Sequence, residues 1–127
     1  MSERHLEKGP LEDGDEYRIV LVTAPDEEVG NMLARGLLEA GLAACVSQVS
    51  GLRSTYTWQG AIEEEEEVLV LIKTLADSLE ALASWIRESH TYETPEIIAL
   101  TPSEVSRAYA EWWAKSCKSP DPPPIES

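Results

Sequence analysis

Histidine and cysteine side chains are few in this sequence, and one histidine stands out among them. His90 is followed three residues later by Glu93, and Cys45 lies earlier in the chain. Imidazole and thiolate are donors that Cu²⁺ and Zn²⁺ favour, and affinity rises with the number of donors that converge. His90 is therefore a candidate ligand for a weak site for Cu²⁺ or another divalent cation. The alternative is a polar residue of a loop or cleft.

Lys73 is a second charged residue in an unusual setting, because it ends a very apolar stretch of sequence. An ammonium group beside apolar side chains needs a partner, since burying an unpaired charge is costly. A carboxylate such as that of Glu93 would supply one. The pattern predicts an ion pair.

Five consecutive glutamates, residues 63–67, suggest cation binding at first sight. Successive side chains of a strand point to opposite faces, so five neighbours cannot converge on one ion. We predict a solvated hairpin tip whose charge discourages edge-to-edge aggregation.

Catalytic sets are not recognisable in the sequence. Only His90 lies in the patterned region, so no Ser/His/Asp or Cys/His set can be assembled. The segment 23–26 after the first predicted strand ends in Asp26, whose charge would repel a phosphate group. The sequence predicts a protein that is not an enzyme.

The charge balance excludes two classes of partner. Ten Lys and Arg residues stand against 24 Asp and Glu residues, a formal net charge of −14. Nucleic acid and anionic membrane surfaces would be repelled, because binding to phosphate depends on clustered basic residues. Cys45 and Cys117 form no CxxC pair, and no apolar stretch approaches the length of a membrane span. We predict a cytoplasmic protein.

Apolar periodicity divides the chain into one domain and two tails. Residues 1–16 are polar and without periodicity, residues 17–116 form the predicted domain, and residues 117–127 are a proline-rich tail. Within the domain, β-branched and apolar runs predict strands over 17–23, 42–50 with a continuation over 52–58, 62–74 and 96–100. Residues 52–58 either prolong the second strand or continue it after a bend at Gly51, and a turn is expected at 59–60.

Helices are predicted between these strands. The first begins at Pro25 and ends before Gly41, which suits a left-handed C-cap. The second has Asp77 as its N-cap, and the third covers 103–116. The order is that of an α+β, ferredoxin-like split β-α-β-β-α-β fold with an antiparallel sheet and an extra C-terminal helix. One sheet face would stay bare, so a homo-oligomer is expected.

Five segments at these spacings resemble the CutA family of divalent-cation tolerance proteins. They are TAPD (23–26), LAACV (42–46), YTWQG (56–60), IKT (72–74) and YETPE (92–96), and the similarity covers about Ile19 to Trp113. The resemblance implies a non-enzymatic homotrimer associated with tolerance to copper and other divalent cations. It also suggests an alternative, a PII-like signalling or adaptor trimer that binds a metabolite or a protein between subunits.

Site residues follow from the resemblance position by position. The copper ligands ascribed to family members fall on Val22, Ser89 and His90 in this sequence, so one of the three ligands is retained. Lys73, Tyr92 and Glu93 occupy characteristic positions near the cleft between subunits. The resemblance therefore implies weak copper binding at His90 and a small-ligand cleft lined by these three residues.

Overall fold

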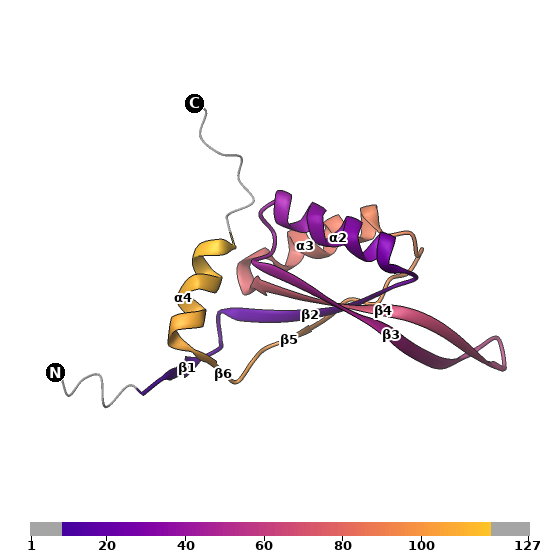
Figure 1. Ribbon diagram of the computed structural model, residues 1–127, viewed down its shortest axis with the longest axis horizontal. Helices are drawn as coiled ribbons and strands as arrows, with labels where there is room; N and C mark the ends of the chain where they lie inside the picture. Colours follow the sequence, from indigo (N-terminus) through magenta and orange to yellow (C-terminus); the bar gives the residue numbers. More distant parts are fainter. Residues whose placement is uncertain (1–8, 118–127) are drawn as a thin grey trace, which may run out of the picture.

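A four-stranded antiparallel sheet with two helices on one face forms the centre of the molecule (Figure 1). The structure is a computed structural model and describes residues 9–117. The strands lie in the order β3-β4-β2-β5, and the helices connect β2 to β3 and β4 to β5. The predicted split β-α-β-β-α-β order is therefore present. The bounds are β2 Tyr17–Ala24, α2 Glu27–Glu39, β3 Cys45–Trp58, β4 Ala61–Leu75, α3 Leu79–Ser89 and β5 Ile98–Leu100.

The main core lies between this sheet and helices α2 and α3. Alternate residues of β2 and β4 point at the helices, and they pack against apolar residues that recur at helical spacing on α2 and α3. Every one of these side chains is closed to solvent: Val20, Val22, Val70 and Ile72 from the sheet, and Leu33, Leu37, Leu82 and Ile86 from the helices. We call this side of the sheet the covered face.

Helix α2 begins and ends close to the predicted residues. Asp26 is its N-cap, and the Asp26 carboxylate accepts a hydrogen bond of 2.9 Å from the Val29 amide. Glu27 and Glu28 in the first turn complement the positive end of the helix dipole. Gly41, with φ of 73°, follows the helix in the left-handed conformation that was predicted for it.

Helix α3 begins differently from the prediction. Asp77 lies inside a 3₁₀ turn, Ala76–Ser78, and α3 starts at Leu79 without a hydrogen bond from a capping side chain. The predicted N-cap at Asp77 is therefore wrong. The chain tightens into the 3₁₀ turn directly after β4, so Asp77 already belongs to the turn and cannot stand in the extended position that an N-cap needs.

A second, two-stranded sheet joins the two ends of the described chain. Strand β1, Leu11–Asp13, pairs with β6, Glu104–Ser106, and helix α4 follows at Arg107–Ser116. The predicted polar tail over 1–16 thus contains a strand, and the last helix begins four residues later than predicted because 104–106 pair with β1. The predicted tail over 117–127 lies outside the described residues beyond Cys117.

Strands β3 and β4 continue past the helices as a long hairpin (Figure 1). A register shift between Val49 and Leu52 marks where β3 leaves the body, with Gly51 at φ of 83°. Gln59 and Gly60, both with positive φ, form the two-residue turn that joins Trp58 to Ala61. We call residues 52–67 the arm.

Candidate functional site

His90 ends helix α3 and points into the protein, with 8% of its surface exposed. Its Nε2 lies 2.8 Å from the carbonyl oxygen of Thr23, and its Nδ1 lies 3.0 Å from the backbone nitrogen of Tyr92. The first contact joins α3 to the end of β2, and the second closes a tight turn. Both ring nitrogens are therefore engaged within one chain.

Tyr92 lies above the His90 ring and reaches the base of the arm. The two rings are stacked with centroids 4.7 Å apart, and the Tyr92 hydroxyl donates a 2.7 Å hydrogen bond to the Glu67 carboxylate. Burial and the neighbouring Glu67 carboxylate both raise the pKa of the Tyr92 phenol. Tyr92 therefore stays protonated and keeps donating to Glu67 throughout the physiological pH range.

Lys73 lies far from Tyr92 and Glu93 in the same chain. It is opposite Cys45 on β3 and Ile19 on β2, six residues along β4 from Glu67. Six residues of a strand span roughly 20 Å. The Lys73 ammonium instead lies 6.0 Å from the ring centroid of Tyr109 on α4.

No ion pair joins Lys73 to Glu93 among residues 9–117 of one chain, so a pairing of these two residues between subunits stays a prediction. Lys73 is half-buried, and its ammonium lies beside the aromatic ring of Tyr109. One chain alone does not bring together the predicted cleft residues.

The remaining predicted metal-site positions add no cluster of donor side chains around His90 within residues 9–117. Val22 is closed to solvent in the core and has no donor atom. Cys45, a free thiol, lies opposite Lys73 of β4, which lies opposite Ile19 of β2. Ile19 is four residues from Thr23, which is about 13 Å along the strand. Within residues 9–117, no group of three or more His, Cys, Asp or Glu side chains could hold a metal ion.

Four of the five consecutive glutamates of the arm lie exposed to solvent, and the fifth, Glu67, is half-buried and bound by Tyr92. Residues 63–66 are exposed and alternate between the two faces, as predicted. Tyr56 lies opposite Glu63 on the neighbouring strand. Partial burial and the acidic neighbours raise the pKa of the Tyr56 phenol.

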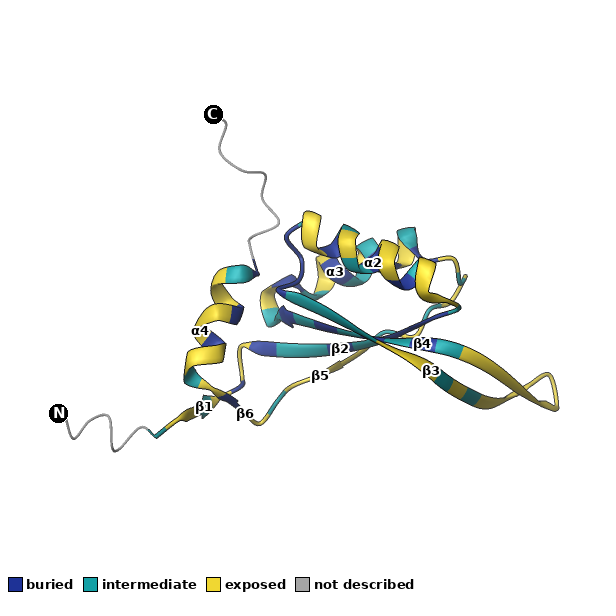
Figure 2. Cartoon of the chain, in the orientation of Figure 1, coloured by how far each residue is buried: buried dark blue, intermediate teal, exposed yellow. Residues whose placement is uncertain are grey.

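The second face of the sheet carries apolar side chains that helices α2 and α3 do not cover. Ile98 and Leu100 of β5 are 47% and 46% exposed and pair with Leu21 and Ile19 of β2. We call this side the open face; Tyr17, Thr23 and Leu75 lie at its ends, and its other members on the strands are Ile19, Leu21, Cys45, Ser47, Val49, Leu69, Leu71, Lys73, Ile98 and Leu100. Exposed and half-buried residues dominate β3 and β5, as Figure 2 shows.

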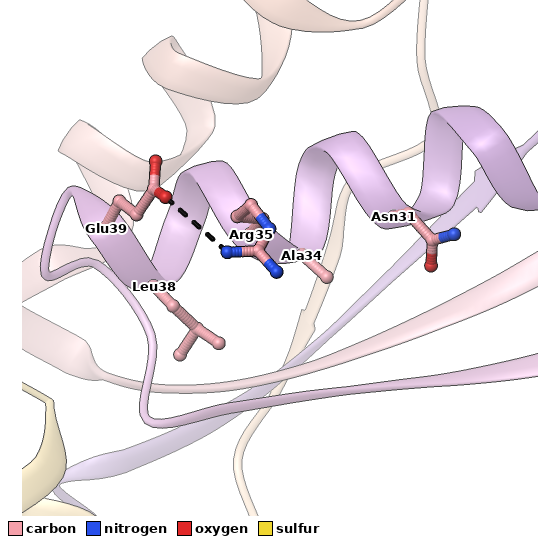
Figure 3. A pocket seen from close by; sticks show the side chains of 5 residues that line it. All are labelled: Asn31, Ala34, Arg35, Leu38 and Glu39. Carbon is pink, nitrogen blue, oxygen red and sulfur yellow. Dashed lines mark ion pairs between the residues drawn. The ribbon is translucent and has the colours of Figure 1, made fainter.

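A shallow hollow along the outer side of α2 was not predicted. It is lined by Asn31, Ala34, Arg35, Leu38 and Glu39 (Figure 3). The one ion pair drawn there, Arg35 to Glu39 at 3.9 Å, joins two highly exposed side chains and adds little stability. Nothing in the sequence distinguishes this surface from an ordinary helix exterior.

The fold and the site define a class of protein: a split β-α-β-β-α-β subunit with one apolar sheet face open and a buried, hydrogen-bonded histidine at the end of its second helix. In the described part of the chain, none of the helices is long and apolar enough to span a bilayer. Residues 18–116 match the family model described as CutA1 divalent ion tolerance protein. The chain belongs to the CutA1 divalent ion tolerance family, as the sequence motifs suggested.

Individual relatives agree with this assignment. The divalent-cation tolerance protein CutA of Thermus thermophilus is 44% identical over 94 residues, which are 74% of this chain and 91% of the relative. The chloroplastic protein CutA of Arabidopsis thaliana is 39% identical over 101 residues, 80% of this chain and 56% of that relative. The solved structure of CutA from Synechococcus elongatus superposes with a TM-score of 0.83 at 38% identity, covering 88% of this chain and 99% of that one.

Proposed function

We propose that this protein acts in divalent-cation tolerance, copper included, as a non-enzymatic homotrimer in the cytoplasm. The observation that carries the proposal is the apolar open face of the sheet in a chain that belongs to the CutA1 family. Relatives bear the name of divalent-cation tolerance protein rather than that of an enzyme. Two free cysteines, Cys45 and Cys117, suit a reducing compartment.

Assembly through the open face would remove a large apolar surface from water. Ile98 and Leu100 lie beside Leu21 and Ile19, so four branched apolar side chains form one continuous patch. Burying such side chains is favourable by about 1.5–3 kcal/mol each when burial is complete. A second and third copy of the chain would supply that burial, and the number three follows from the resemblance to CutA proteins.

A trimer would also complete the predicted cleft. Lys73 lies on the open face, and Tyr92 lies roughly 20 Å away at the base of the arm. We propose that Lys73 of one subunit meets Tyr92 and Glu93 of the next, so that each cleft is built from two chains. The cleft would present an ammonium, a phenol and a carboxylate to a small polar ligand, with the PII-like signalling role as the alternative function.

Metal binding, on this proposal, is weak and largely electrostatic. The net charge of −14 and the exposed glutamates of the arm attract divalent cations without fixing them in one geometry. His90 as a copper ligand remains a prediction from the sequence. Copper binding should then weaken steeply as salt is raised to physiological levels, because exposed charges are screened.

Two aspartate substitutions of matched exposure test the assembly. Ile98→Asp places a charge on the open face, whereas Leu38→Asp places one on the outer side of α2 at the same 47% exposure. Light scattering after gel filtration should give three times the 14.0 kDa chain mass for the wild type and for Leu38→Asp. Ile98→Asp should give the mass of one chain. A wild-type mass of one chain would overturn the trimer.

The tolerance role is tested in a bacterial host that lacks its own member of the family. Expression of the wild type should raise the Cu²⁺ concentration at which growth stops, and Leu38→Asp should do the same. Ile98→Asp should lose the effect if assembly is required. Equal growth with and without the wild-type protein would count against tolerance as the function.

A further inference from the structure

We infer that His90 is a positioning residue and not a copper ligand in the folded protein: its neutral imidazole fastens the turn 90–94 to the end of β2 and holds Tyr92 against the base of the arm. The inference rests on the contacts of His90 within one chain, and it holds whether or not the trimer forms. It concerns the one predicted copper ligand that the sequence retains.

The backbone partners fix the protonation of the ring. A carbonyl oxygen can only accept, so Nε2 must carry the proton in its 2.8 Å contact with Thr23. A backbone N–H can only donate, so Nδ1 must be unprotonated in its 3.0 Å contact with Tyr92. His90 is thereby defined as the neutral Nε2–H tautomer, with both nitrogens used.

Half of this arrangement is the one that a metal-binding histidine needs. Such a histidine commonly donates its second ring N–H to a backbone carbonyl, as His90 donates to Thr23. The lone pair of Nδ1, which would bind the metal, is however taken by the Tyr92 amide. Copper would have to displace that hydrogen bond in a buried site where no three His, Cys, Asp or Glu groups of the described chain converge.

The contacts form a connected path from the body to the arm. The Thr23 carbonyl at the end of β2 binds His90, His90 binds and stacks on Tyr92, and the Tyr92 hydroxyl binds Glu67 at 2.7 Å. Glu67 pairs with Leu52 directly after the register shift in β3. The path therefore ends where the hairpin leaves the sheet, and His90 is its central member.

Two amide substitutions separate the two hydrogen bonds. In His90→Asn, the side-chain oxygen can still accept from the amide two residues on, as in an Asx turn, but the link to Thr23 is lost. In His90→Gln, the side-chain amide can reach Thr23 as a donor, but the acceptor for Tyr92 is lost. Each variant thus keeps one of the two hydrogen bonds that the imidazole ring makes.

The first test is nitrogen-15 NMR of the imidazole in a His5→Ala protein, where His90 is the one remaining histidine. We expect the Nε2–H tautomer with a slowly exchanging ring proton. We also expect the Tyr92 amide proton to exchange about fivefold faster in His90→Gln, the change that corresponds to one ordinary hydrogen bond, and to stay near the parent rate in His90→Asn. An Nδ1–H tautomer, or equal exchange in both variants, would overturn the inference.

The second test is a Cu²⁺ titration against a competing chelator at physiological salt, again in the His5→Ala protein. Apparent affinity should agree within a factor of two between this protein and its His90→Asn derivative. Saturable binding of one ion per chain that His90→Asn abolishes, with the far-ultraviolet circular dichroism unchanged, would establish His90 as a ligand and overturn the inference. Failure of the trimer proposal would leave both tests unaffected.

Discussion

The two faces of the sheet are built from the same strands and differ in what covers them. On the covered face, Val20 and Ile72 pair across β2 and β4 and are closed to solvent beneath α2 and α3. On the open face, their sequence neighbours Leu21 and Leu71 pair in the same register and remain partly exposed. Alternation along a strand thus sends one apolar set into the subunit and another to its surface.

The difference separates what holds one chain together from what could hold several chains together. Apolar residues on both faces are unusual for an antiparallel sheet, where one face normally meets water and carries polar side chains. The covered face accounts for the folding of the subunit. The open face is as apolar as a protein core, but helices α2 and α3 do not cover it. For this reason we assign it to contacts between subunits.

The largest expected effect on stability comes from shortening a buried side chain on the covered face. Ile72→Ala should lower the free energy of unfolding by about 2–5 kcal/mol, because it leaves a cavity under the helices. Leu71→Ala, made in the Ile98→Asp background that keeps chains apart, should lower the free energy of unfolding by less than half as much, since Leu71 is already partly exposed to solvent. Urea denaturation followed by circular dichroism measures both losses. Equal losses would mean that the two faces are equally buried within one chain.

The covered layer can be tested more finely at two glycines of α2. A methyl group at Gly36 would overlap the indole ring of Trp85 on α3, which is rigid and packed against the core. A methyl group at Gly30 would meet the side-chain amide of Gln48, the far end of a flexible chain.

Gly36→Ala should therefore destabilise the protein by about 1–3 kcal/mol through overpacking. Gly30→Ala should be neutral or stabilising by up to about 1 kcal/mol, because alanine favours the helix and the amide can move aside. The shift of the urea midpoint checks the pair. A stabilised Gly36→Ala would show that α2 and α3 are less tightly packed than the structure indicates.

The sequence predicted the elements whose signal is local. Strand β4 and helix α2 carry long apolar patterns of the right period, and Gly41 and Gly60 mark their ends, so these were found within a few residues. Strands β1 and β6 were missed because each has three residues and forms only by pairing with the other. Leu11 lies opposite Ser106, a partner that no local pattern reveals.

The candidate site divides in the same way. His90 could be singled out from the sequence because it is the one histidine of the patterned region, but its partner Thr23 lies 67 residues away. Lys73 was expected to pair with a carboxylate such as that of Glu93 because it ends a very apolar stretch, yet the sheet register places Lys73 near α4. Residue types indicate which groups can do chemistry, and only the register decides which of them meet.

The smallest effect is expected where helix α4 covers one end of the open face. Tyr17 has 8% of its surface exposed, packs edge-on against Trp113 at 4.9 Å, and donates a 3.2 Å hydrogen bond to the Ala110 carbonyl. Tyr17→Phe keeps the ring and removes the hydroxyl. The free energy of unfolding should fall by about 1 kcal/mol at pH 7, the net value of one hydrogen bond.

The pH dependence of the same variant identifies the cause. Burial, followed by the nearby carboxylates of Glu12, Glu16 and Asp13, raises the pKa of Tyr17 above its ordinary value of 10.0. The folded state therefore holds this proton more tightly than the unfolded state does, so the stabilisation is complete below pH 10 and is lost as the pH rises through the raised pKa. Urea midpoints between pH 8 and pH 11 should fall more steeply for the wild type than for Tyr17→Phe. Parallel curves would mean that this end of the sheet is as open to water as Ile98 and Leu100.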